Sequence, residues 1–115
     1  MLFLLIFFLL SINIMKNYYI YILKLEEKKY YIGYTNNIIS MIQYHLDGKN
    51  EWTNLYKVNK LKKKKIKIKD KDCVKECNKM TLKLMKKYGW INVRGSIWEK
   101  IKIEKPKELD LQILS

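Results

Sequence analysis

The side chains best suited to chemistry gather in one stretch, residues 19–48, as tyrosines and a histidine at regular intervals. Tyr21 and Tyr31 are ten residues apart, and His45 is the only histidine of the chain. Phenol and imidazole groups can both take part in proton transfer. Each residue alone has an ordinary explanation, because tyrosines are common in strands and a lone histidine is more often structural. Taken singly, these residues therefore do not indicate a functional site.

A hairpin and a helix are predicted to position these residues. Alternating side chains predict strands over residues 17–26 and 29–34, joined by a short polar turn. Residues 35–37 offer helix N-caps, so a helix is expected over residues 37–47. The tyrosines then lie on the hairpin and His45 lies on the helix that follows it.

The predicted helix has two faces of interest. Ile38, Ile42 and Leu46 recur at helical intervals and are expected to face the core. Met41 and His45 are four residues apart, so they share another face. On its own, Met41 is simply a core methionine.

A basic strand is predicted after a loop over residues 49–58. It covers about residues 60–69, where Lys65, Lys67 and Lys69 alternate with isoleucines. Such a strand has one buried and one basic face. The lysines favour two interpretations equally, a solvated edge that blocks aggregation and a surface that contacts phosphate.

A long helix is expected over residues 71–88, with Asp70 as its cap. Glu76 lies at the margin of its apolar stripe, where the simplest expectation is an ion pair with Lys79, three residues on. The stripe consists of Cys73, Val74, Cys77, Met80, Leu84 and Met85. The two cysteines are interpreted as core thiols of a reducing compartment, in preference to half of a zinc site, because no second cysteine pair follows.

The last part of the chain predicts a turn at Arg94 and Gly95, a strand over residues 98–103 and a short helix from Pro106. The expected fold is therefore a small α/β (α+β) domain with a three-stranded, mainly antiparallel sheet flanked by helices. Residues 16–96 form the domain, residues 97–115 an extension, and residues 1–15 a separate apolar segment.

Composition favours a polyanionic partner. The chain has 115 residues and a formal net charge of +13, which suits nucleic acid, although lysine encoded by A/T-rich codons explains part of this charge. Residues 1–15 are too short to span a membrane and lack the features of a signal peptide. An upstream extension, with translation starting at Met15, is the preferred explanation, and a genuine membrane segment is the alternative. An intracellular location is expected on the first explanation.

The order and spacing of the motifs resemble the GIY-YIG nuclease family. Tyr19, Ile20 and Tyr21 stand at the first family motif, without its glycine, and Tyr31-Ile32-Gly33 is the second motif intact. Thr35 and two asparagines follow as in many members, and His45 falls twelve residues after Gly33, where a family histidine often stands.

The second half of the chain agrees with this resemblance. Glu76 lies on the long helix like the metal-binding glutamate of the family, and Asn92 follows sixteen residues later, near a family asparagine. Residues 88–95 look like the closing element of small single-domain members common in large DNA viruses. The resemblance covers about residues 17–96.

The resemblance implies a DNA endonuclease that uses one divalent cation, Mg²⁺ or Mn²⁺. It implies that Tyr21 takes a proton from water, that Tyr31 and His45 position water and phosphate, and that Glu76 holds the cation. The residues that would contact the substrate are Gly33, Thr35, Lys65, Lys67, Lys69 and Asn92.

One position departs from the family pattern. Eight residues after Gly33 the family carries an arginine that orients and neutralises the scissile phosphate, and here that residue is Met41. Arg94 is the only arginine of the chain and belongs to another segment. Three hypotheses follow: a nuclease with impaired activity, a non-cleaving relative that binds nucleic acid, and a small basic protein attached to a membrane through residues 1–15.

Overall fold

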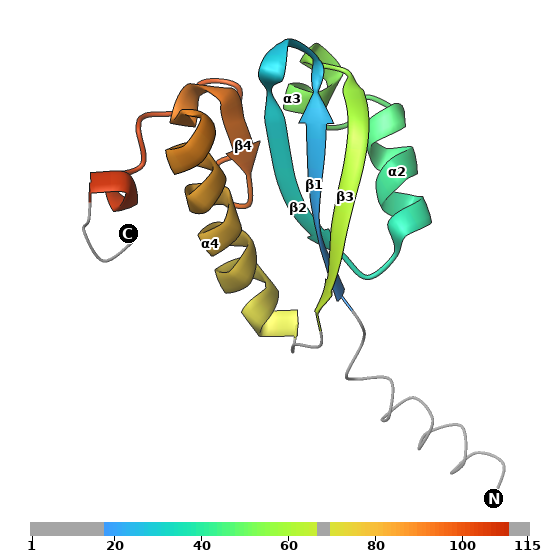
Figure 1. The fold of residues 1–115 in the computed structure, drawn as a ribbon. Coiled ribbons are helices and arrows are strands. Elements are labelled where there is room, and N and C mark those ends of the chain that lie inside the picture. Colours follow the sequence, from blue (N-terminus) through green and yellow to red (C-terminus); the bar gives the residue numbers. More distant parts are fainter. Residues whose placement is uncertain (1–17, 67–69, 111–115) are drawn as a thin grey trace, which may run out of the picture.

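The computed structural model describes residues 18–66 and 70–110, which form a mixed sheet with helices on both faces (Figure 1). Residues 1–15, Lys67 and Lys69 lie outside the described part. In chain order the elements are β1 (Tyr18–Leu25), η1 (Glu26–Lys28), β2 (Tyr30–Thr35), α2 (Ile38–Leu46), α3 (Glu51–Leu55), β3 (Val58–Ile66), α4 (Asp70–Tyr88), η2 (Trp90–Asn92), β4 (Val93–Gly95) and η3 (Lys107–Asp110).

The predicted hairpin forms the centre of the sheet. The strand order is β3-β1-β2-β4, and β1 pairs antiparallel with both β2 and β3. The expected α+β class is confirmed, but the sheet has four strands where three were predicted, because β4 adds to β2 in parallel.

Strand β4 corrects the prediction for the end of the chain. Arg94 and Gly95, expected in a turn, belong to the strand, and the strand expected over residues 98–103 is reduced to a single bridge between Trp98 and Gly95. A Cβ at Gly95 would overlap the backbone of Ile32. The glycine thus lets β4 approach β2 closely, and the chain turns away directly afterwards.

Two clusters of apolar side chains hold the layers together. Because side chains alternate along a strand, Ile20 and Ile32 point to one face and Tyr21 and Tyr31 to the other. The first pair packs with Met85 of α4, and the second packs with α2 and α3. Tyr21 and Tyr31 therefore lie on the side of the sheet that packs against α2 and α3. Figure 1 shows these two helices beside the hairpin.

The face that α2 turns to the sheet differs from the prediction. Asn37 caps the helix as expected, with its side chain accepting a hydrogen bond from the Ser40 amide at 3.0 Å. The buried residues are Met41 and His45. Ile42 and Leu46, expected in the core, are 38% and 73% exposed.

Two further differences lie beside these helices. The predicted loop after α2 contains α3, which Asn50 caps by accepting from the Thr53 amide at 3.0 Å. In α4, Cys73 and Cys77 are buried thiols, as expected, whereas Val74 is exposed. Among the described residues, no helix is both long and apolar enough to cross a membrane.

Candidate functional site

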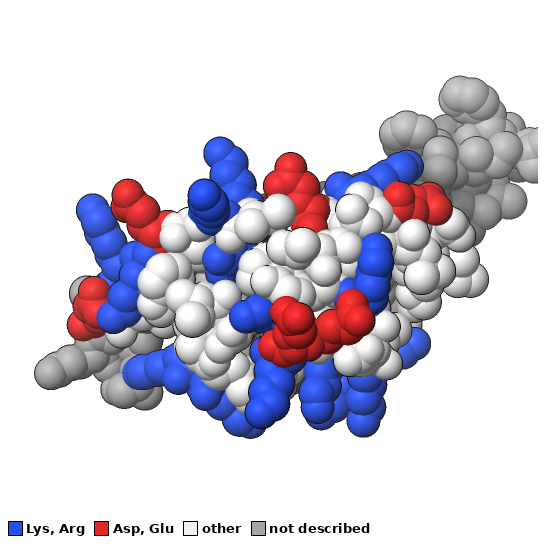
Figure 2. Space-filling view, turned by 90° about the horizontal axis from the view of Figure 1, so that it is seen from above, with Lys and Arg blue, Asp and Glu red and all other residues white. Residues whose placement is uncertain are grey.

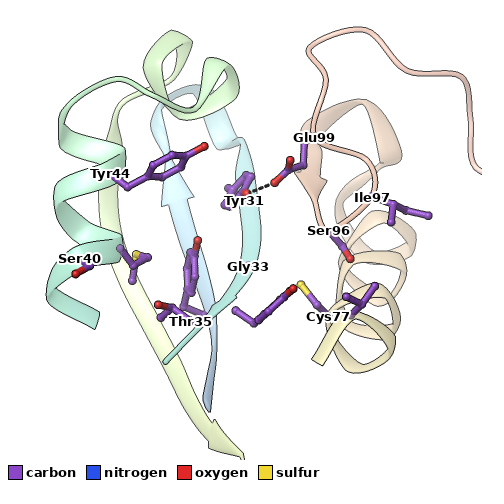
Figure 3. A pocket seen from close by; sticks show the side chains of 13 residues that line it. Tyr31, Gly33, Thr35, Ser40, Tyr44, Cys77, Ser96, Ile97 and Glu99 are labelled. Atoms are coloured by element: carbon purple, nitrogen blue, oxygen red, sulfur yellow. Dashed lines mark hydrogen bonds between the residues drawn. The ribbon is translucent and has the colours of Figure 1, made fainter. Parts of the chain in front are cut away.

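A pocket of about 570 Å³ opens beside β2, next to the point where its pairing with β4 ends (Figure 3). The tyrosine face of the sheet forms its floor, with α2 on one side and α4 with the end of β4 on the other. The side chains that matter for its chemistry belong to Tyr21, Tyr31, Met41, Tyr44, Cys77 and Glu99.

A chain of buried hydrogen bonds starts at the pocket wall. The Tyr21 hydroxyl lies 3.0 Å from Nε2 of His45, and Nδ1 of His45 lies 2.8 Å from the Thr53 hydroxyl. When Nδ1–H donates to Thr53, Nε2 is left to accept the hydroxyl proton of Tyr21. The chain thus connects a pocket-lining phenol to an internal base.

Burial sets the protonation states of these groups. It lowers the pKa of His45 to about 4, so the imidazole is neutral near pH 7. Burial also raises the pKa of Tyr21, and the nearby Cys77 and Glu99 add to that effect. At neutral pH, Tyr21 is therefore a protonated phenol bonded to a neutral imidazole.

Tyr31 connects the pocket floor to the end of the chain. Its hydroxyl donates to Oε1 of Glu99 at 2.8 Å, across 68 positions of sequence (Figure 3). Burial is the main cause that raises the pKa of Tyr31, and the nearby Tyr21 and the hydrogen bond to Glu99 raise it further. Tyr31 is therefore a stable donor that orients the Glu99 carboxylate.

Gly33 leaves room for the Tyr21 side chain. The two residues pair across β1 and β2, and a Cβ at Gly33 would overlap the Tyr21 phenol. Steric contact with Tyr21 thus explains why this position of the second motif is a glycine in this chain. Thr35, also at the pocket, exchanges two hydrogen bonds of 3.0 Å with the backbone of Asn37 and so supports the turn into α2.

The pocket has no basic side chain of its own. Neither lysine nor arginine occurs among the described residues that line it, and Met41 occupies the wall beside Tyr21. Arg94 is buried elsewhere, with its guanidinium carbon 4.5 Å from the centre of the Trp52 ring. It donates to four backbone carbonyl groups, so its role is structural.

Two predicted site residues lie away from this pocket. Glu76 is not among its lining residues and forms the ion pair expected with Lys79, at 3.6 Å. Asn92 donates to the Tyr88 carbonyl at 2.8 Å and accepts from Lys29 at 2.7 Å, which fixes the turn after α4.

Of the three predicted lysines, the structure describes only the backbone position of Lys65, on the edge strand β3. Lys65 lies on β3 opposite Tyr19, and Lys67 and Lys69 fall outside the described residues. The exposed neighbours on β3 are Lys60, Lys62 and Lys63, and the Lys63 ammonium lies 5.5 Å from the centre of the Tyr19 ring. Lys60, Lys62 and Lys63 are not among the described residues that line the pocket.

No family model matches the chain, and no curated protein or solved structure matches it either. The GIY-YIG resemblance therefore rests on the residues themselves. The structure brings Tyr21, Tyr31, Gly33 and His45 together, as the motif spacing predicts. It leaves Glu76 outside that group.

Sequence reasoning missed Glu99 and Thr53. Thr53 follows the N-cap Asn50 by three residues, a signal for a short helix but not for contact with His45. Glu99 stands in a segment expected to be an ordinary strand. Its meeting with Tyr31 depends on how the chain folds back after β4, which no local pattern indicates.

The donor atoms of the pocket suit a hard cation. Among the described residues no group of three or more His, Cys, Asp or Glu side chains is gathered as a metal centre. Mg²⁺ does not need one, because it is commonly held by one or two carboxylates, water and substrate phosphate. The pocket supplies one carboxylate and several hydroxyl groups.

Proposed function

We propose that this protein is a nuclease of the GIY-YIG type that hydrolyses DNA phosphodiester bonds slowly with a divalent cation. The observation that carries the proposal is the hydrogen bond between Tyr21 and the neutral His45 at the wall of an open pocket. A neutral imidazole bonded to a phenol can accept a proton at neutral pH. Phosphodiester hydrolysis requires such a proton acceptor to activate the attacking water.

The residues suggest the following proton path. Water loses a proton to the Tyr21 oxygen while the Tyr21 hydroxyl proton passes to Nε2 of His45, and Thr53 holds the ring from the other side. The hydroxide attacks phosphorus, a new P–O bond forms, and the bond to the leaving oxygen breaks. The leaving oxygen then takes a proton from solvent water, and the hydroxide formed there is neutralised by the proton that His45 returns through Tyr21.

A divalent cation, when bound, would offset the negative charge that develops on the phosphoryl oxygens. The pocket needs such a charge because no lysine or arginine is found among its described lining residues. Met41 stands where the family has its arginine, and loss of a preorganised donor costs roughly 10² to 10³ in rate. A slow enzyme is therefore expected.

A second candidate function follows from the methionine at position 41. With a thioether at Met41, the chain would bind nucleic acid through its basic surface without cutting it. The exposed lysines of β3 favour this alternative. The membrane hypothesis depends on residues 1–15, which lie outside the described residues.

Cleavage of nicked and branched DNA by the full chain, with Mg²⁺ or Mn²⁺, tests the proposal. Tyr21→Phe should lower the rate by roughly 10²-fold or more, because the phenol that relays the proton is gone. Tyr19→Phe is the matched control, since Tyr19 lies on the same strand outside the pocket. Its rate should equal that of the parent chain.

Met41→Arg separates the two candidates. If the parent chain cuts and Met41→Arg cuts faster, by on the order of 10- to 10²-fold, the slow nuclease is supported. Cleavage by Met41→Arg alone supports the binding protein. Absence of cleavage by both chains, with both folded, contradicts the nuclease proposal.

A further inference from the structure

The geometry of α4 turns Glu76 away from the pocket. Val74 of the same helix lines the pocket, and a residue two positions further lies about 200° around the helix axis. Asn78, on the flank near Val74, accepts a hydrogen bond from the pocket residue Ser96. Glu76 is thus on the opposite flank, where Lys79 compensates its charge.

Glu99 has the properties that Glu76 lacks. It is the only acidic residue among the described residues that line the pocket, and its side chain reaches the Tyr31 hydroxyl (Figure 3). The ion pairs of the described residues are Lys79–Glu76 and Lys105–Asp110, so Glu99 carries a charge that neither of them balances. The residue is also exposed, which gives solvent ions access.

The segment that carries Glu99 is fixed on both sides. Before it, Gly95 and Trp98 exchange two backbone hydrogen bonds, at 3.0 and 2.8 Å, and Trp98 packs against the core. After it, Arg94 donates to the carbonyl groups of Lys100 and Ile101, at 2.9 and 2.8 Å. Its carboxylate is therefore held at the pocket although the side chain is exposed.

We propose that Glu99, rather than Glu76, is the carboxylate through which this pocket binds a divalent cation, an inference that rests on the proposed function. The bond from Tyr31 uses Oε1 and orients the group, and a carboxylate has further lone pairs on both oxygens. Mg²⁺ and Mn²⁺ are bound by such oxygens together with water and phosphate. A cation there would lie beside Tyr31 and face the pocket that has no cation of its own.

Terbium luminescence of the full chain, without DNA, tests the assignment. Tb³⁺ binds carboxylate oxygens, and excited tyrosine sensitises its emission when the two are close. The parent chain should give emission that Mn²⁺ displaces. Glu99→Gln should weaken Tb³⁺ binding about tenfold or more, because the amide has no charge to offer the cation.

Two matched variants complete the experiment. Glu76→Gln and the exposed Glu104→Gln each remove one negative charge and should leave Tb³⁺ binding unchanged. Urea unfolding of each variant checks that the fold is retained. Tb³⁺ binding that survives in Glu99→Gln, binding that is lost in Glu76→Gln, or absence of binding to the parent chain would each overturn the assignment.

The Tb³⁺ experiment and the DNA cleavage assay can fail independently of each other. Tb³⁺ binding that depends on Glu99, in a chain that never cuts DNA, supports this assignment and contradicts the nuclease. Cleavage by the parent chain that persists at full rate in Glu99→Gln supports the nuclease and contradicts this assignment.

Discussion

At the scale of single residues, surroundings decide what each side chain can do. His45 is buried on α2 between the Tyr21 and Thr53 hydroxyls, and burial keeps it neutral. Two hydrogen bonds satisfy both ring nitrogens without a charge. The same contacts that fit the ring into the core therefore keep it unprotonated, with Nε2 placed to accept the hydroxyl proton of Tyr21.

The depressed pKa of His45 predicts a pH-dependent stability. Its pKa is about 4 in the folded chain and 6.5 when unperturbed, so between these values the unfolded chain binds more protons. Stability should be fully present above about pH 6.5 and fall as the pH drops to about 4. Because one pKa unit corresponds to about 1.4 kcal/mol, the loss should be on the order of 3 kcal/mol.

Urea unfolding of the parent chain and His45→Gln at several pH values measures this effect. His45 is the only histidine, so the difference between the two curves isolates it from the carboxylates. The variant should show a flatter pH dependence between pH 4 and 6.5. Parallel curves would show that the folded chain does not hold His45 in its neutral form.

At the scale of elements, strong periodicity was a sound guide and weak periodicity was not. The hairpin and α4 were predictable because their patterns run over many residues. The buried face of α2 was predicted wrongly. The spacing of Ile42 and Leu46 gives no information about the hydrogen bonds that His45 makes with Tyr21 and Thr53 in the core. β4 has three residues, too few for a period.

The residues of the candidate site likewise divide into those that the sequence predicts and those that it does not. Tyr21, Tyr31, Gly33 and His45 were found because the motifs that carry the family resemblance lie within one hairpin and one helix. Glu99 was missed because its approach to Tyr31 depends on long-range packing, which Arg94 secures. A local pattern carries no information about such a contact.

Arg94 should therefore be critical for the segment after β4. Arg94→Lys keeps the charge, but one ammonium cannot replace a guanidinium that serves the carbonyls of Trp90, Val93, Lys100 and Ile101. Buried carbonyl groups would lose partners, and stability should fall by about 2 to 4 kcal/mol. Urea unfolding measures the change.

Lys102→Arg is a suitable control for this substitution, because Lys102 is exposed on the same segment. It should alter stability by less than about 0.5 kcal/mol. An equally small effect of Arg94→Lys would mean that the closing segment is held by its apolar contacts alone.

At the scale of the whole molecule, charge and pocket are separate features. Lysines project from much of the outline and gather along the lower edge of Figure 2. The net charge is +13, yet within the part of the chain that the structure describes no lysine or arginine lines the pocket. On the proposed function, the basic surface would hold the nucleic acid backbone, and the pocket would need a cation to offset the charge of the phosphate.

Binding of duplex DNA should consequently weaken steeply with salt. If the surface neutralises about five phosphates, affinity should fall by roughly 10² to 10³ between about 50 and 200 mM salt, because bound counterions are released. Fluorescence anisotropy with a labelled oligonucleotide measures this slope.

The double variant Lys62→Gln/Lys63→Gln removes two exposed lysines of β3 and should reduce the slope by about two. Lys105→Gln, whose lysine pairs with Asp110 at 3.1 Å near the C-terminal end, is the control and should change the slope little. Equal effects of the two variants would indicate diffuse attraction by net charge, whereas a loss confined to the β3 variant locates the DNA backbone on that strand. Affinity that does not change with salt would contradict both proposed functions, because each depends on phosphate contact.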